Sequence, residues 1–342
     1  MNSRINPIKA NSIITLSSLV IILAGMKLAV SIIAPFLFAM FISVIALFPL
    51  FWLYKKGIKK SIAITILIIS MFLIGLVFTF ILGSSISEFI ASLPKYESML
   101  RTNIDILIKY LSDFGIDVSK STVIKYINPA SAFKTIGNIV GQLGNLLTNL
   151  FLITFISIFI LLEASSMPEK LKYILKDSVL SLNNLKDIGE SIKNYLLIKT
   201  YVSILTGVIV GISLYFLGID FAVLWGVIAF LLNYVPNIGS IMAAFPASLM
   251  ALVQYGITKF IIVVILYLLI NVVIGNIIEP KFLGKGLGLS PLIVFLSLIF
   301  WGWLLGIVGM FLSIPLTMIV KIIFSVSKDK KWISVLLSDK VD

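Results

Sequence analysis

The chain has 342 residues, of which 60% are hydrophobic and only 12% are charged, and its mean hydropathy is +1.14. Soluble domains are about half apolar and about a quarter charged, so the composition excludes an ordinary soluble protein and predicts an all-α polytopic membrane protein. The formal charge of +12 does not indicate nucleic-acid binding, because the lysines lie between apolar stretches. With no Cys and no His, disulfides, thiolate chemistry and His-ligated metals are excluded, and carboxylates are the expected proton carriers.

The N-terminal region, residues 1–82, is expected to form three membrane helices, at 11–26, 28–54 and 61–82. The first follows Arg4 and Lys9, as a signal peptide would. No small-residue cleavage site follows it, so we interpret it as a retained span. Four lysines in the turn after the second span predict that this turn is cytoplasmic.

Residues 83–145 are charged, mixed in sign and long for a connection between spans. Apolar residues recur there every three or four positions, which is typical of an amphipathic helix: Tyr96, Leu100, Ile104, Leu107 and Leu111. A second helix is expected from 131 towards 150, with Gly137 and Gly141 spaced for close helix contact. We therefore expect a helical extracytoplasmic arm, which either serves in assembly or covers the membrane bundle.

The next segments return the chain to the cytoplasm. Residues 146–163 predict a fourth span, and residues 164–199 predict an amphipathic helix at the cytoplasmic surface, because it contains six lysines. A fifth span is expected at 200–217. It opens a transport core at 200–326, which a basic cytoplasmic tail, 327–342, follows.

Two long apolar segments of the core are interrupted. Residues 221–253 contain the polar stretch Asn-Tyr-Val-Pro-Asn-Ile-Gly-Ser from 233 to 240, and residues 289–321 contain three glycines and Pro315. An ordinary span, 260–278, lies between them. Paired interrupted segments indicate an internal repeat with a binding site near the membrane midplane. The alternative for the first interruption is a short extramembrane loop of turn-forming residues.

Two topologies fit this pattern, and both place the two termini in the cytoplasm. In one, each broken segment crosses the membrane, which gives about eight membrane segments that all cross. In the other, each is a re-entrant hairpin and six segments cross. The hairpin topology places Lys281 and Lys285 inside and Lys259 outside, and the positive-inside rule favours it by two lysines to one.

Polar residues of the core are the candidate site. In the first broken segment, the proline and glycine disrupt helical geometry and the other residues supply hydrogen-bonding groups: Asn233, Pro236, Asn237, Gly239 and Ser240. In the following span, Asn271, Gly275 and Glu279 are four residues apart and share a helix face, which Asn276 flanks. A carboxylate in a membrane segment is a candidate for ion or proton coupling, although Glu279 could also pair with Lys281 at the interface.

Three stretches of the sequence resemble signatures of the autoinducer-2 exporter (AI-2E) family of bacterial membrane proteins. They are the segments at 233–240, at 276–284 (NIIEPKFLG) and at 286–317, and the resemblance extends over essentially the whole chain. It implies an inner-membrane transporter of the branch credited with exporting the quorum-sensing signal autoinducer-2. It also implies a homo-oligomer, for which a pentamer is expected, and a moving transport domain.

The residue chemistry is compatible with more than one function. Autoinducer-2 is a small hydroxyl-rich molecule, and a site for it needs amide and hydroxyl partners. Similar proteins have been assigned sodium–proton antiport, which would use carbonyls freed near Pro236 together with Glu279. A non-transporting membrane scaffold is a third possibility. An enzyme is not expected, because the chain has no His or Cys and its intramembrane stretches have no carboxylate pair at useful spacing. An ATP-driven pump is not expected either, because there is no GxxxxGK[ST] loop, and no cofactor is expected.

Overall fold

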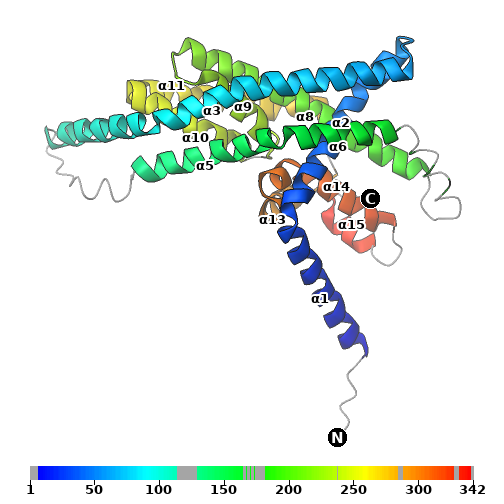
Figure 1. Cartoon of the computed structure of the whole chain (residues 1–342). Helices are drawn as coiled ribbons and strands as arrows, with labels where there is room; N and C mark the ends of the chain where they lie inside the picture. Colours follow the sequence, from blue (N-terminus) through cyan, green and yellow to red (C-terminus); the bar gives the residue numbers. More distant parts are fainter. Residues whose placement is uncertain are drawn as a thin grey trace, which may run out of the picture.

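The computed structural model describes residues 7–113, 129–164, 182–236, 238–283, 288–326 and 331–339, and three single positions between 164 and 182. Every regular element within these residues is a helix (Figure 1). Five helices are long and apolar enough to cross a membrane, and several shorter apolar helices accompany them. The prediction of an all-α polytopic membrane protein is therefore confirmed.

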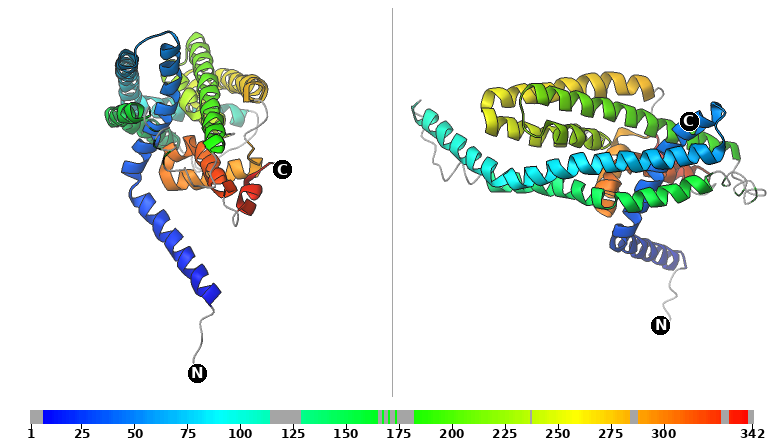
Figure 2. Two further views of the ribbon diagram at one scale, coloured as in Figure 1. Left: turned by 90° about the vertical axis from the view of Figure 1, so that its right-hand side faces the viewer. Right: turned by 45° about the horizontal axis from the view of Figure 1, so that its top comes forward.

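The first half of the chain includes the longest helix that the structure describes. Its helices are α1 (Pro7–Leu28), α2 (Val30–Lys55), α3 (Lys60–Asp113), α5 (Pro129–Thr148) and α6 (Leu150–Glu163). Helix α3 is a single rod of 54 residues, and α5 and α6 return alongside it (Figures 1 and 2). Helix α1 projects away from the other helices (Figure 1).

The predicted arm is the continuation of a membrane helix, because α3 runs through the expected boundary at residue 82 without a break. Three residues of its predicted apolar face, Tyr96, Leu100 and Ile104, are buried, whereas the side chains of Leu107 and Leu111 lie outside the described ones. Tyr96 Oη donates a hydrogen bond of 2.6 Å to Asp220 Oδ2, and Asn103 Nδ2 donates one of 3.0 Å to the Val253 carbonyl. These bonds tie the arm to the second half of the chain, so the arm covers the bundle there.

The second half contains the interrupted segments. Its elements are α8 (Leu182–Phe216), α9 (Ala222–Leu232), α10 (Gly239–Tyr255), α11 (Ile257–Ile270), the π-helix η1 (Asn271–Ile278), α12 (Glu279–Leu283), α13 (Pro291–Phe311), α14 (Ser313–Val326) and α15 (Lys331–Leu337). The predicted boundary at 199/200 lies inside α8, which joins the expected surface helix to the fifth span in one element.

The first interrupted segment folds as a helical hairpin. Helices α9 and α10 have 11 and 17 residues. At 1.5 Å per residue they are about 16 and 26 Å long, less than the about 30 Å of a hydrocarbon core. Their outer ends lie side by side, because the Asp220 N–H donates to Gln254 Oε1 at 3.2 Å and Tyr255 Oη donates to the Gly218 carbonyl at 3.0 Å. The segment therefore turns back on itself.

The second interrupted segment is also a hairpin. Its helix α13 is broken at Gly306, where φ is 67° and ψ is −146°. Across the hairpin, Trp301 Nε1 donates to Thr317 Oγ1 at 2.9 Å, and Lys321 Nζ donates to the Gly288 carbonyl at 2.6 Å. The second segment thus also turns back on itself.

Each hairpin is closed by a glycine that touches the backbone of the other arm. A Cβ at Gly239 would lie 1.8 Å from the Leu232 carbonyl oxygen, and one at Gly309 would lie 2.0 Å from the Trp301 carbonyl oxygen. We expect Gly239→Ala and Gly309→Ala each to lower the melting temperature in detergent, because overpacking costs about 1–3 kcal/mol or more. Gly83→Ala is the control, since nothing lies within 4 Å of its Cβ. Equal melting temperatures for all three variants would contradict the hairpin contacts.

Candidate functional site

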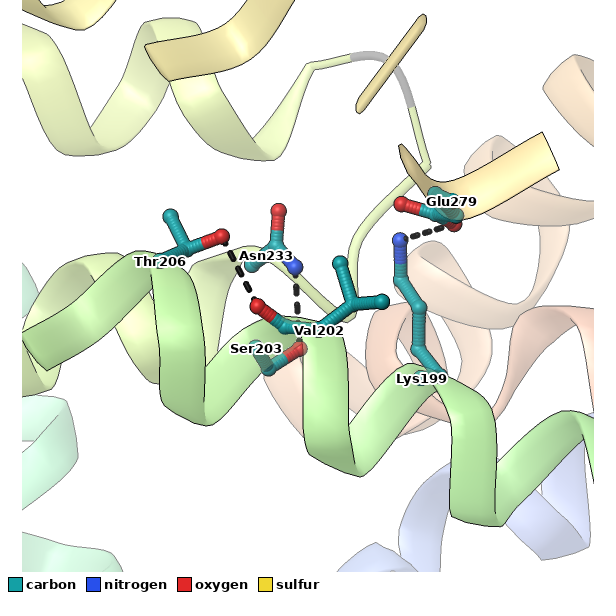
Figure 3. A network of polar contacts seen from close by, with 6 residues as sticks. All are labelled: Lys199, Val202, Ser203, Thr206, Asn233 and Glu279. Atoms are coloured by element: carbon teal, nitrogen blue, oxygen red, sulfur yellow. Dashed lines mark hydrogen bonds and ion pairs between the residues drawn. The ribbon is translucent and has the colours of Figure 1, made fainter. Parts of the chain in front are cut away.

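One face of α8 carries a polar stripe. Lys199, Ser203 and Thr206 are spaced by four and three residues, so they lie along the same side of the helix (Figure 3). All three are buried, with Lys199 only 6% exposed. The first hairpin packs closely on this helix, because Gly207 and Gly226 lack side chains where the backbones of α8 and α9 meet. The polar stripe therefore faces the interior of the core.

The tip of the first hairpin is bonded to α8. Asn233 Nδ2 donates a hydrogen bond of 3.0 Å to Ser203 Oγ, while its amide oxygen points away from α8 (Figure 3). Tyr234 Oη donates to Thr200 Oγ1 at 2.8 Å. Because the Nδ2 group of Asn233 is fixed by its hydrogen bond to Ser203, the carbonyl oxygen of the same amide is oriented to accept a bond from a further partner.

A small cavity lies between α8, the first hairpin and α11. It is lined by hydroxyl and amide residues among apolar ones: Thr206, Ala229, Asn233, Ser240, Ala243, Tyr267, Ile270, Asn271, Ile274 and Gly275. Its volume is about 10 Å³, which is room for about one water molecule. The Tyr267 hydroxyl is fully buried and has no hydrogen-bond partner in the described part of the chain. Buried polar groups are normally paired, so this hydroxyl indicates a place for a polar ligand.

The span after the first hairpin is not a regular α-helix. Residues Asn271–Ile278 form a π-helix, in which the Glu279 N–H bonds to the carbonyl of Ile274, five residues earlier. Pro280 explains the wider turn, because it has no N–H and its ring would clash with the carbonyl four residues earlier. Asn276 lies within this π-helix, and its side chain is exposed.

Glu279 forms a buried ion pair with α8. Lys199 Nζ lies 2.6 Å from Glu279 Oε1, and the two side chains are 7% and 16% exposed (Figure 3). The partner of Glu279 is therefore Lys199 rather than Lys281, which the sequence alternative named and which is exposed. The pair joins α8 to the start of α12 and compensates both charges in a region of low dielectric constant.

Comparison with known proteins identifies the family of this chain. A family profile described as "AI-2E family transporter" matches residues 16–329. The chain belongs to the AI-2E transporter family.

It is 43% identical to the "AI-2 transport protein TqsA" of Escherichia coli K12 over 96% of this chain and 95% of that protein. It is 34% identical to the "Putative transport protein YhhT" of the same strain over 95% and 93% of the two chains. A "Putative transport protein" of Haemophilus influenzae is 37% identical over 97% of both chains. The AI-2E assignment and these names indicate transport rather than catalysis.

In this AI-2E chain, the structure brings together only part of the predicted site. Asn233, Ser240 and Asn271 line the cavity. Gly239 closes the hairpin, and Pro236 lies in the hairpin tip but does not line the cavity. Asn276 is exposed, as described above, and Asn237 lies outside the described residues.

Several polar residues of the candidate site were not predicted, among them Lys199, Thr206 and Tyr267. Lys199 was assigned to the cytoplasmic surface with its neighbouring lysines, but it is buried. The signal that identifies it is the polar stripe with Ser203 and Thr206 in an otherwise apolar helix. Tyr267 precedes Asn271 by one helical turn, so the face that was recognised from Asn271 onwards begins one turn earlier.

Proposed function

We propose that this chain is a secondary transporter that exports autoinducer-2 or a related small polar metabolite across the bacterial inner membrane, with both termini in the cytoplasm. The observation that carries the proposal is the cavity of neutral hydrogen-bonding groups, in which the Tyr267 hydroxyl is buried without a partner. Such groups suit a hydroxyl-rich solute, because each of its polar atoms needs a partner when it leaves water. The relative TqsA, whose name specifies AI-2 transport, supports this choice of substrate.

The two hairpins provide the means for alternating access. We place the first hairpin in the membrane from the extracytoplasmic side and the second from the cytoplasmic side, as the lysine distribution favours. Their inner ends meet, since the ring centroids of Tyr234 and Phe311 are 6.2 Å apart. A sugar-sized molecule does not fit into a cavity of about 10 Å³. In our proposal the first hairpin therefore moves away from α11 to admit the substrate, and the described conformation is closed.

The second candidate function is monovalent cation–proton antiport. The cavity volume favours it, because a bare cation is close in size to the single water molecule that the cavity accommodates. However, none of the described residues that line the cavity carries a carboxylate, and Glu279 is already neutralised by Lys199. We therefore assign Glu279 to proton coupling together with Lys199, rather than to cation binding. A scaffold without transport would tolerate apolar residues at the cavity. Homo-oligomerisation is compatible with each function and is tested by mass measurement in detergent.

Flux in proteoliposomes tests these proposals. The purified protein is reconstituted with a trapped pH dye, a proton gradient is imposed, and autoinducer-2 or Na⁺ is added separately. Proton movement that follows autoinducer-2 alone supports coupled export of the signal, and movement that follows Na⁺ alone supports the antiporter. If neither produces movement, counterflow of labelled autoinducer-2 separates uncoupled transport from a scaffold.

Tyr267→Phe is expected to separate function from stability. The variant removes a buried hydroxyl that bonds to no described residue, so the melting temperature should stay the same or rise. Transport should fall about tenfold, which corresponds to about 1.4 kcal/mol for one lost hydrogen bond to the solute. Tyr215→Phe is the control, because Tyr215 is 73% exposed on α8. Unchanged flux in Tyr267→Phe would remove this hydroxyl from the site.

A further inference from the structure

A second and much larger cavity lies outside the candidate site. Its volume is about 510 Å³, within the range of ligand-binding pockets, and it separates α2, α3 and α6 from α8 and α9. On α3 its wall extends from Leu67 to Ile86, which is about 28 Å of helix at 1.5 Å per residue. The cavity therefore runs beside a membrane helix for most of the thickness of a hydrocarbon core.

The walls of this cavity are almost entirely apolar. None of the described residues that line it is charged. The hydroxyls of Ser70, Thr200 and Tyr234 are engaged with protein partners, since Ser70 and Thr200 donate to the Leu67 and Leu196 carbonyls and Tyr234 donates to Thr200. Apart from these three residues and Thr154, every described residue of the lining is apolar, so the cavity offers few of the polar groups that autoinducer-2 or a cation would require.

A space of this size is not expected to remain empty. Protein interiors are packed as densely as organic crystals, and an empty apolar cavity loses dispersion contacts along its whole lining. Two residues that line the cavity, Phe48 and Ile74, are 57% and 65% exposed on the outer surface of α2 and α3. Because this surface belongs to membrane-spanning helices, the cavity is continuous with the hydrocarbon of the bilayer.

We propose that this cavity is a lipid site that holds an acyl chain of a membrane phospholipid. The chain enters between α2 and α3 and lies along α3, against the hairpin-tip residue Tyr234 and against Phe311. The elongated shape, the apolar lining and the opening at the lipid-facing surface all match a hydrocarbon chain. The lipid would fill the space between the long helices of the first half and the core, where it supports their packing without a covalent or polar link.

Gly75 allows a direct test. It lines the cavity, and a Cβ at this position meets nothing within 4 Å, so Gly75→Phe places a ring in the space of the acyl chain. Gly83 is the matched control, because it lies on the same helix, also has nothing within 4 Å, and does not line the cavity. Gly75→Leu repeats the test with a smaller side chain in case Gly75→Phe does not fold.

The measurement is the number of phospholipid molecules that remain bound to each chain in detergent, counted by native mass spectrometry. We expect wild type and Gly83→Phe to retain the same number, and Gly75→Phe or Gly75→Leu to retain one fewer. The same number of bound lipids in all variants would overturn the proposal. If Gly75→Phe or Gly75→Leu also raised the melting temperature without losing a lipid, the cavity of the wild type would be empty. Dissociation of an oligomer by Gly75→Phe without lipid loss would identify a second copy of this chain as the occupant instead.

Discussion

Glu279→Gln and Lys199→Met are each expected to destabilise the protein by about 3–5 kcal/mol and to abolish proton-coupled transport. Each substitution leaves one buried charge without its partner, and an uncompensated charge in a region of low dielectric constant is costly. The side chains are only 16% and 7% exposed, so water cannot replace the lost partner. The melting temperature in detergent and the pH-dye flux measure the two effects separately.

The double variant Lys199→Met/Glu279→Gln distinguishes a structural from a coupling role. Replacing both members of a buried ion pair is often neutral or stabilising, so the double variant should melt near the wild-type temperature. If the pair carries the proton, this folded variant still fails to couple flux to the proton gradient. Wild-type flux with normal pH dependence in the double variant would show that the pair is structural.

An exposed ion pair of the same chain is the control for this experiment. Arg101 and Glu97 are 2.8 Å apart on α3, and their side chains are 51% and 32% exposed. Exposed pairs contribute about 0–1 kcal/mol, so Glu97→Gln should change neither the melting temperature nor the flux by a measurable amount. A comparable loss in Glu97→Gln would mean that the assay responds to charge in general.

The interrupted segments could be predicted from sequence, but their path could not. Pro, Gly and Asn at 233–240 mark a break in a helix wherever the chain goes afterwards. A crossing segment and a hairpin both satisfy this local pattern. The distinction depends on contacts between distant residues, such as the hydrogen bond between Asp220 and Gln254, which are 34 residues apart. Only the folded chain contains this information.

The candidate site shows the same division between local and distant determinants. Asn233 and Asn271 were predicted because amides are unusual in apolar segments. Asn276 was included by α-helical spacing from Glu279, but it lies in a π-helix and its side chain is exposed. Lys199 was interpreted as a surface lysine together with its neighbouring lysines. Its partner Glu279 is 80 residues away in the sequence, so the pairing was not visible. Burial of a charge depends on its partner, and no local pattern identifies that partner.

Asn233→Ala is expected to reduce transport to background while the protein still inserts into the membrane. The change removes the carbonyl oxygen that points away from α8 and the Nδ2 hydrogen bond to Ser203, so the tip of the hairpin loses both a ligand group and its attachment. The lost protein hydrogen bond is expected to cost about 1 kcal/mol of stability, which is too little to prevent folding. Flux and membrane insertion are measured on the same preparation, and Ser203→Ala isolates the contribution of the attachment.

Asn276→Ala is the variant to compare with Asn233→Ala. Both asparagines belong to the site predicted from the sequence, but only Asn233 lines the cavity in the structure. Helical spacing placed Asn276 in the site, whereas its side chain is exposed in the structure. If the cavity between α8, the first hairpin and α11 binds the substrate, Asn233→Ala loses transport and Asn276→Ala keeps it. The reverse result would mean that the substrate is recognised along the exposed face of η1, and the cavity around Tyr267 would then be a structural feature of the closed conformation.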